Sequence, residues 1–283
     1  MPDAERFFGH PGHRRVAETP IFDDAGTTEP TTAGGQLLAN GEHPLMTEEV
    51  ILKVGLTPKH QCSYLGHEHE QLLVLMDHSL LNASGYERLL TAGFRRSGND
   101  IYRPHCPACN ACQSLRIHSE RFVPSRSQKR IRQLNQDIEL VLSYDDKPEY
   151  YQLYERYIRE RHHDGSMYPP SRTQYKGFLH CDWMPPLYLE MRKDNRLIGV
   201  ATTDLLPHSL SAMYTFFDPA HADRSLGTFA ILSQLELAKR TGRSWLYLGY
   251  LVEECRKMNY KRQYLPHERL IQGEWKNIDS KPE

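Results

Sequence analysis

The sequence lacks any long apolar run, and no segment of its 283 residues approaches the length that a helix needs to cross a membrane. It shows no secretory signal either, and six cysteines without such a signal favour a reducing compartment. These two absences predict a cytoplasmic protein without a membrane partner. A further absence concerns chemistry, because no Ser-His-Asp or Cys-His signature of a covalent nucleophile stands out.

Net charge is also nearly absent, because 35 lysine and arginine residues balance 36 acidic residues. Bulk charge therefore neither indicates nor excludes a nucleic-acid partner, and any basic surface must be local. The hydrophobic content of 39% is ordinary, so the chain can form a core as one large domain or two small ones.

The first 45 residues lack a sustained apolar period and mix glycine, threonine and proline with acidic residues. This composition predicts a disordered tail over residues 1–45. Met46 opens the sequence that follows, and one hypothesis is that Met46 is the natural start of the protein.

Three cysteines lie close together in the run from Tyr102 to Cys112. Cys106, Cys109 and Cys112 are three residues apart, so two thiolates can reach one ion, and Cys62 upstream could complete a four-thiolate site. The alternative is a rigid, proline-punctuated turn whose thiols are simply buried. Spacing alone leaves both interpretations open.

A basic segment follows, because residues 121–132 carry five basic residues and no acidic residue. Ser125, preceded by a proline, predicts a helix start, and Arg126, Lys129 and Arg130 then share one face of the helix. A charge run is usually a solvated helix face. Here the lack of any interleaved acid favours phosphate binding instead.

The C-terminal part predicts three antiparallel strands, a loop, a helix, another strand and a further helix, at residues 187–191, 197–205, 210–217, 226–240, 245–250 and 253–258. This order is typical of a GNAT-type N-acyltransferase core, in which the helix N-terminus binds an anion between diverging strands. The helix start at Arg224 to Phe229 resembles a coenzyme A pyrophosphate loop. It departs from that loop at Phe229, where a small residue would let the backbone approach the pyrophosphate.

Several motifs together resemble one family. They occur in this order: Gly93–Gly98, Tyr102–Cys112, Arg161–Pro170, Tyr214–Pro219, Arg224–Gly227, Tyr247–Tyr250 and Cys255–Lys261. They are similar to motifs of the bacterial aspartate/glutamate leucyltransferases, which are related to the eukaryotic arginyl-tRNA–protein transferases. The resemblance runs from about Thr57 to the end of the chain.

The resemblance implies a fold and a reaction. The fold would be α/β (α+β) with a GNAT-like acyltransferase core and a cysteine-rich loop. Two GNAT-like halves would occupy residues 46–145, with the cysteine loop and the basic helix, and residues 146–283, with the catalytic groups. The enzyme would take leucine from leucyl-tRNA and join it to the N-terminal amine of proteins that begin with Asp or Glu, which marks them for degradation.

This reaction starts from an activated ester, so positioning supplies much of the rate and no cofactor is required. The acceptor amine must still lose a proton, and the oxyanion needs hydrogen-bond donors. Our candidates for this chemistry are Tyr168, His162, His163, Asp164 and Tyr250. The alternative for residues 162–170 is a rigid structural turn, and each tyrosine has a structural alternative as a core residue.

Cations are expected to bind the carboxylate of the acceptor or the end of the tRNA. The candidates are Arg95, Arg96, Arg103, Arg224, Arg256, Lys257 and Lys261, and the sequence does not divide them between the two ligands. Arg126, Lys129 and Arg130 are expected to contact the tRNA backbone. The related eukaryotic enzymes suggest a structural Zn or Fe–S site at Cys62, Cys106, Cys109 and Cys112.

Three alternative functions remain open at this point. An N-acetyltransferase that uses acetyl-CoA would share the fold, although Phe229 and the basic helix argue against it. Arginine rather than leucine could be the donor, because only the resemblance distinguishes them. A non-catalytic RNA-binding module with a zinc-stabilised loop would leave the polar and aromatic residues 162–170 without a purpose.

Overall fold

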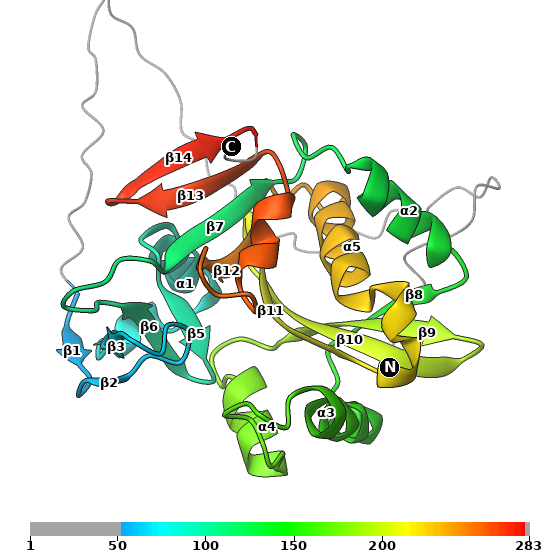
Figure 1. The fold of residues 1–283 in the computed structure, drawn as a ribbon, viewed down its shortest axis with the longest axis horizontal. Coiled ribbons are helices and arrows are strands. Elements are labelled where there is room, and N and C mark those ends of the chain that lie inside the picture. The colour runs from blue at the N-terminus through cyan, green and yellow to red at the C-terminus, as the bar shows by residue number, and fades with distance from the viewer. Residues whose placement is uncertain (1–51, 281–283) are drawn as a thin grey trace, which may run out of the picture. The chain divides into compact units, whose positions relative to one another are not determined.

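A large mixed sheet organises the molecule (Figure 1), and the computed structural model describes residues 52–280. The order of its eight strands is β14-β13-β7-β12-β11-β10-β9-β8. In that order the strands are Glu274–Ile278, His267–Ile271, Gln113–His118, Trp245–Leu251, Ser209–Phe217, Arg196–Leu205, Leu187–Lys193 and Glu139–Ser143. β11 and β12 run parallel, whereas the other neighbouring strands run antiparallel.

A smaller sheet lies beside the large one, with the order β1-β4-β6-β5 (Figure 1). Its strands are Val54–Leu56, Leu72–Leu75, Asp100–Pro104 and Arg95–Ser97, and a separate hairpin pairs β2 (His60–Gln61) with β3 (His69–Glu70). The turn between β5 and β6 needs Gly98, whose φ is 58°, because side chains other than hydrogen are disfavoured there. β5 and β6 therefore form a hairpin.

The helices begin where their capping residues predict. Asn82, Ser125 and Ser171 each accept a backbone N–H at the start of a helix, and Ser125 forms a full capping box with Gln128. The five α-helices of the described chain are α1 (Ala83–Thr91), α2 (Arg126–Leu134), α3 (Pro148–Arg161), α4 (Arg172–Leu179) and α5 (Leu226–Arg240). Short 3-10 helices occupy His78–Leu80, Pro219–Arg224 and Asn259–Gln263, and the last of these is η3.

The two faces of the large sheet bury different partners, because neighbouring residues of a strand point to opposite sides. Thr203 on β10 accepts a hydrogen bond from Gln234 of α5, while Asp204 pairs with Arg96 of β5. On β12, Leu251 packs in the same core cluster as α5, and Tyr250 bonds to Gly93 after α1. α5 and α2, which contacts it, therefore cover one face, and the smaller sheet and α1 lie on the other.

β11 and β12 diverge after a short parallel contact. Their register pairs Ser209–Ser211 with Trp245–Tyr247 and then ends. An extra residue bulges each strand at this point, Met213 in β11 against β10 and Leu248 in β12 against β7. Residues 212–215 of β11 consequently remain partly exposed in the middle of the sheet.

The C-terminal core follows the predicted order, with α5 matching the predicted helix at residues 226–240. The mixed α/β class is confirmed. The helix predicted at residues 253–258 is wrong, because this segment folds as consecutive turns before η3, with Met258 N–H bonded to Cys255 O. The prediction also missed β8, β13 and β14.

The predicted division at residue 145 stays a prediction, and strand pairing crosses it. β7 and β8 come from the expected N-terminal half, yet they pair with β12, β13 and β9 of the other half. The predicted tail at residues 1–45 and the hypothesis on Met46 lie outside the described residues. Within residues 52–280, no helix combines the length and the apolar character that a membrane span requires.

Candidate active site

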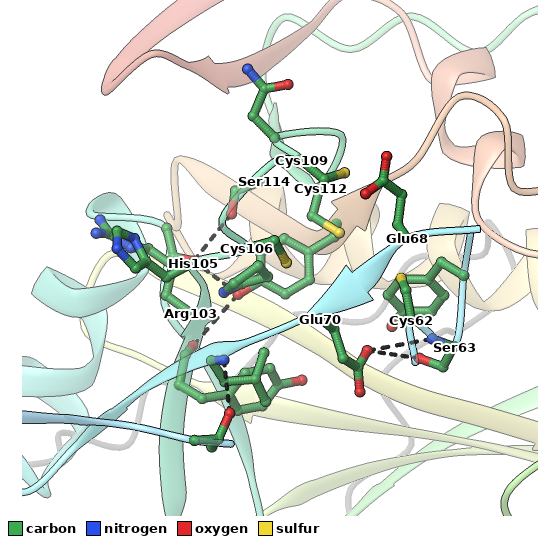
Figure 2. Close-up of a pocket in the computed structure, with 18 of the residues that line it drawn as sticks. Cys62, Ser63, Glu68, Glu70, Arg103, His105, Cys106, Cys109, Cys112 and Ser114 are labelled. Atoms are coloured by element: carbon green, nitrogen blue, oxygen red, sulfur yellow. Dashed lines mark hydrogen bonds between the residues drawn. The ribbon is translucent and has the colours of Figure 1, made fainter. Parts of the chain in front are cut away.

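A cavity of about 1140 Å³ lies beside the end of β12 (Figure 2). Its walls come from residues 62–70, from β4 and β6, from the cysteine loop at residues 105–112, and from the β13–β14 turn. Tyr250 of β12 and Ser166 of the loop between α3 and α4 also line it. Folding thus brings together the cysteine loop, Tyr250 and the loop of Tyr168, which the sequence keeps far apart.

Tyr250 lies at the inner wall of this cavity. Its side chain is buried, and its hydroxyl donates to Gly93 O at 3.0 Å. Burial raises the pKa of Tyr250 above its usual value, so the hydroxyl stays protonated at neutral pH and keeps its role as a donor.

Cys106, Cys109 and Cys112 lie on one loop of the cavity wall, and Cys62 lies across from them (Figure 2). Burial and repulsion between the neighbouring thiols raise the pKa of Cys112 to about 12, and the same causes raise the pKa of Cys106. Within residues 52–280, no group of three or more His, Cys, Asp or Glu side chains is arranged to hold a metal ion. Folding thus places all four predicted thiols on the wall of one cavity, and the metal site stays a prediction.

Two buried cations flank β12 where it diverges from β11. Arg95 donates to Ser211 Oγ at 3.0 Å and to Ala212 O at 2.7 Å, the first backbone carbonyl of β11 beyond its pairing with β12. Lys261 Nζ donates to Tyr250 O at 2.6 Å. Neither cation pairs with a carboxylate in the described part of the chain. Burial, followed by the charge of Arg95, lowers the pKa of Lys261 to about 7.

Two other predicted cations are engaged by carboxylates. Arg96 is fully buried, and its guanidinium binds Asp204 Oδ1, with Nε at 2.9 Å. Arg224 binds Asp137 through both of its terminal nitrogens, at 2.7 and 3.0 Å. Each of these arginines would have to give up an ion pair to bind a substrate, so the structure favours a structural role for both.

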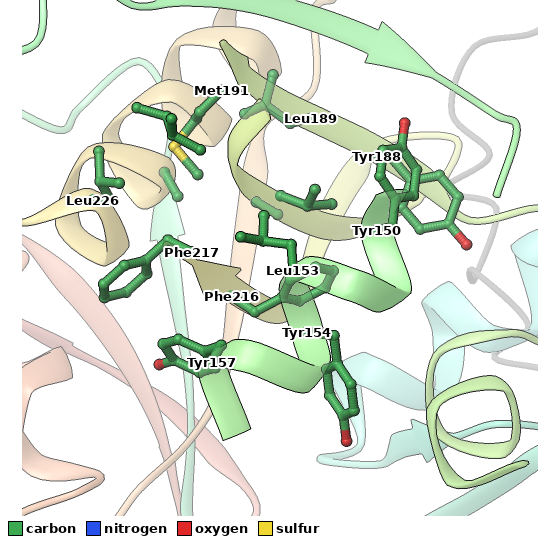
Figure 3. Packing of buried hydrophobic residues seen from close by; sticks show 14 of the residues in the cluster. Tyr150, Leu153, Tyr154, Tyr157, Tyr188, Leu189, Met191, Phe216, Phe217 and Leu226 are labelled. Carbon is green, nitrogen blue, oxygen red and sulfur yellow. The ribbon is translucent and has the colours of Figure 1, made fainter. Parts of the chain in front are cut away.

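The loop after α3 carries the remaining candidates for catalysis. The ring of His162 packs against Tyr157, which belongs to the aromatic core around Phe217 (Figure 3). Burial and the nearby Lys257 cation lower the pKa of His162, so its imidazole is neutral at pH 7. Asp164 receives a hydrogen bond from Lys257 at 3.3 Å, which joins this loop to the segment after β12.

Exposed candidates lie around this loop. Tyr168 is 45% exposed, and the side chains of His163 and Arg256 face solvent. Their assigned roles stay predictions. Arg103 lines the cavity, where Nη1 donates to Ala92 O at 3.0 Å.

Helix α2 presents its basic residues to solvent. Arg126, Lys129 and Arg130 are exposed, and none forms an ion pair with another described residue. Gln128 at the start of α2 donates to Gln263 O of η3, and Asn135 after its end donates to Arg224 O before α5. Helix α2 is therefore bonded at its start to η3, which follows β12, and just past its end to the segment before α5, while its basic residues face solvent.

Sequence reasoning missed several contributors to the cavity. Glu68 and Glu70 line it from the β3 region, and Gln272 lines it from the β13–β14 turn. No spacing rule marks these residues, although the alternation of histidine and glutamate at residues 67–70 was visible. Asp204 was also missed, because its arginine partner lies 108 residues away in the chain.

Two family models match the chain. The model for the N terminus of arginine-tRNA-protein transferase matches residues 60–130, and the model for its C terminus matches residues 149–271. These ranges include the cysteine loop, Tyr250, the loop of Tyr168 and Lys261.

Relatives match over nearly the whole of their own length. An aspartate/glutamate leucyltransferase of Aeromonas hydrophila subsp. hydrophila is 99% identical over 238 residues, which are 84% of this chain and 100% of that protein. The protein of the same name from Pseudoalteromonas atlantica is 52% identical over 230 residues, covering 81% of this chain and 99% of that protein.

Among solved structures, the C-terminal domain of a putative lysylphosphatidylglycerol synthetase from Agrobacterium fabrum gives a TM-score of 0.39 at 12% identity. The match covers 59% of this chain and 51% of that one, and a similarity this low supports no conclusion. The family models and the close relatives agree with each other, and on them the chain belongs to the arginine-tRNA-protein transferase family, within its aspartate/glutamate leucyltransferases.

Proposed function

We propose that this protein transfers leucine from leucyl-tRNA to the N-terminal amine of proteins that begin with Asp or Glu. The product would carry a destabilising N-terminus and be directed to degradation. Because charged tRNA is a substrate, the proposal includes a cytoplasmic location. Membership of the family and the name shared by the close relatives support this assignment.

The structural observation that supports a tRNA substrate best is the unpaired basic face of α2. Arg126, Lys129 and Arg130 are exposed without carboxylate partners in the described chain, although the protein as a whole is nearly neutral. The helix that carries this face is hydrogen-bonded to η3 and to the segment before α5, which flank the diverging strands. Backbone phosphates of an acceptor stem bound to α2 would leave the 3′ end near that divergence.

The chemistry needs no covalent intermediate. The acceptor ammonium loses a proton, the free amine attacks the ester carbon, and the ribose oxygen leaves with a proton. The neutral imidazole of His162 can accept a proton, and the protonated Tyr250 hydroxyl can donate to the oxyanion if it gives up its hydrogen bond to Gly93 O. The loop of His162 reaches the cavity of Tyr250 through Ser166.

A coenzyme A substrate receives less support. Arg224 is bound by Asp137, and Phe229 is buried in the core around α3 and α5, so neither side chain is free at the helix start. We still propose a GNAT-like core made of β9 to β12 and α5. The supporting features are three antiparallel strands, the helix, and a parallel fourth strand that diverges from its neighbour.

A structural metal at the cysteine loop stays a separate proposal. Four thiols supply donors of the type that Zn and Fe–S clusters use, but the described arrangement does not bring three donors together around one position. No step of the transfer depends on it. Elemental analysis of protein purified without oxygen tests it, and protein without bound Zn or Fe would end the proposal.

The decisive experiment supplies defined aminoacyl-tRNAs and peptides. Radiolabelled leucyl-tRNA and arginyl-tRNA are each incubated with peptides that begin with Asp, Glu or Ala. We expect label from leucyl-tRNA on the Asp and Glu peptides alone. Transfer from arginyl-tRNA, or labelling of the Ala peptide at equal rate, would contradict the proposal.

A salt titration tests the role of α2. Replacing Arg126, Lys129 and Arg130 with Gln should weaken binding of leucyl-tRNA and reduce the salt slope by about 2, since each phosphate contact contributes roughly 0.7–0.9. The matched control replaces three exposed basic residues on other elements with Gln, namely Arg88, Lys176 and Lys276. If both triple variants bind alike, α2 is not the tRNA surface.

A further inference from the structure

The cavity beside β12 is unlike a nucleic-acid surface. Its described charged lining includes three carboxylates, Glu68, Glu70 and Asp100, and one permanent cation, Arg103. Carboxylates repel a phosphate backbone. At about 1140 Å³ the cavity also exceeds the roughly 300–1,000 Å³ of typical small-molecule sites, so it has room for a short peptide.

The cavity and the basic helix lie on opposite faces of the large sheet. Tyr250 faces the cavity, whereas its neighbour Leu251 packs in the core cluster of α5, the helix that α2 contacts. The basic face of α2 and the cavity are therefore separate surfaces, so a tRNA bound at α2 and an acceptor bound in the cavity would not compete for one surface.

The groups of opposite charge in the cavity have unused hydrogen-bonding capacity. Glu70 Oε2 accepts from Ser63 Oγ at 3.2 Å, while Glu70 Oε1 has no hydrogen-bond partner within residues 52–280. The Glu68 side chain forms one long contact, 4.0 Å to the exposed His67. Arg103 uses Nη1 for Ala92 O, and its Nε and Nη2 donate to no other described residue.

We propose that this cavity binds the N-terminal residue of the acceptor protein, with the α-ammonium at Glu70 and Glu68 and the side-chain carboxylate at Arg103. An N-terminal Asp or Glu carries one positive and one negative group, and the cavity offers one partner for each. The inference rests on the proposed function, and it assigns the acceptor subsite among cations that the sequence left undivided.

Kinetics with two substrates test the ammonium site. The variant Glu68→Gln/Glu70→Gln keeps the shape of both side chains and removes their charge. With an Asp-initiated peptide, we expect its KM for the peptide to rise at least tenfold, while its KM for leucyl-tRNA stays within twofold of the native value. Glu160→Gln, at an exposed position of α3, is the control and should change neither value.

Arg103→Gln tests the site for the side-chain carboxylate of the acceptor, and it remains informative if Glu68→Gln/Glu70→Gln misfolds. The native protein should prefer an Asp peptide to the matching Asn peptide in kcat/KM, and Arg103→Gln should reduce that preference at least tenfold. Fluorescence anisotropy with a labelled Asp peptide measures binding without transfer, and acetylation of its N-terminus should abolish binding to the native protein.

The outcomes separate the two proposals. If native protein transfers leucine but Glu68→Gln/Glu70→Gln leaves the peptide KM unchanged, the acceptor subsite is refuted and the proposed function stands. The same holds if the acetylated peptide binds as tightly as the free one. If native protein transfers no leucine to any acidic peptide, the proposed function itself fails.

Discussion

Replacing Lys261 with Met should change how the stability of the protein depends on pH. Lys261 is 5% exposed, its ammonium donates to Tyr250 O, and it has no carboxylate partner in the described chain. Burial lowers its pKa from 10.5 to about 7. Since each tenfold change in a protonation equilibrium corresponds to about 1.4 kcal/mol, protonated Lys261 destabilises the fold by roughly 5 kcal/mol below pH 7.

The sign follows from where each state holds the proton. Between pH 7 and 10.5 the unfolded chain keeps a proton on this lysine, whereas the folded protein has released it. The contribution of Lys261 to the free energy of unfolding therefore increases with pH between pH 7 and 10.5. From pH 7 to pH 9 the gain is about 2 kcal/mol, because the folded lysine is still half protonated at pH 7.

Denaturation by guanidinium chloride at pH 7, 8 and 9 measures this effect. The free energy of unfolding of Lys261→Met, relative to the native protein, should fall by about 2 kcal/mol between pH 7 and 9. Met also removes the hydrogen bond to Tyr250 O, which lowers the stability of the variant at every pH. Lys257→Met is the control, because Lys257 is exposed and paired with Asp164.

A difference between Lys261→Met and the native protein that stays constant from pH 7 to 9 would refute the reasoning. It would mean that Lys261 has an anionic partner or enough water to keep an ordinary pKa. A pH-dependent difference of the same size in Lys257→Met would show that the effect is not specific to the buried position.

Three further predictions concern stability. Arg96→Met should cost about 3–5 kcal/mol in chemical denaturation because it leaves Asp204 buried without its partner, and adding Asp204→Leu should recover part of that loss. Gly98→Ala should lower the melting temperature in calorimetry, because its new Cβ would lie 2.1 Å from Gly177 O at a φ of 58°; an unchanged value would contradict the described turn. Asp137→Asn should flatten the acid limb of unfolding below pH 4, because hydrogen bonds from an arginine and a lysine lower the pKa of this carboxyl, and its contribution is lost as pH falls. An acid limb identical to the native one would contradict that reasoning.

Local patterns predicted the C-terminal core well. The capping residue Ser125 lies where the sequence predicted a helix start, and the apolar period of residues 226–240 matches α5. These features depend on neighbours within one or two turns of the chain, so the local sequence is enough to predict them.

The short strands were harder to predict. β13 carries two adjacent charged residues, Glu268 and Arg269, and β14 carries Glu274 and Lys276 at alternate positions, so neither strand has an apolar run. β8 was missed although it forms an edge of the large sheet next to β9. Pairing with distant strands, rather than local propensity, stabilises such segments.

The sequence by itself determined the family, the order of the core elements and the residue types available for binding anions and acidic peptides. Only the tertiary structure decided which of these cations are free, because Arg96 and Arg224 meet their carboxylates across 108 and 87 residues of chain. It also placed Tyr250 between a basic helix on one face of the sheet and a cavity with carboxylates on the other. The energy of two charges depends on the distance between them in the folded protein. Their separation along the sequence does not determine that distance.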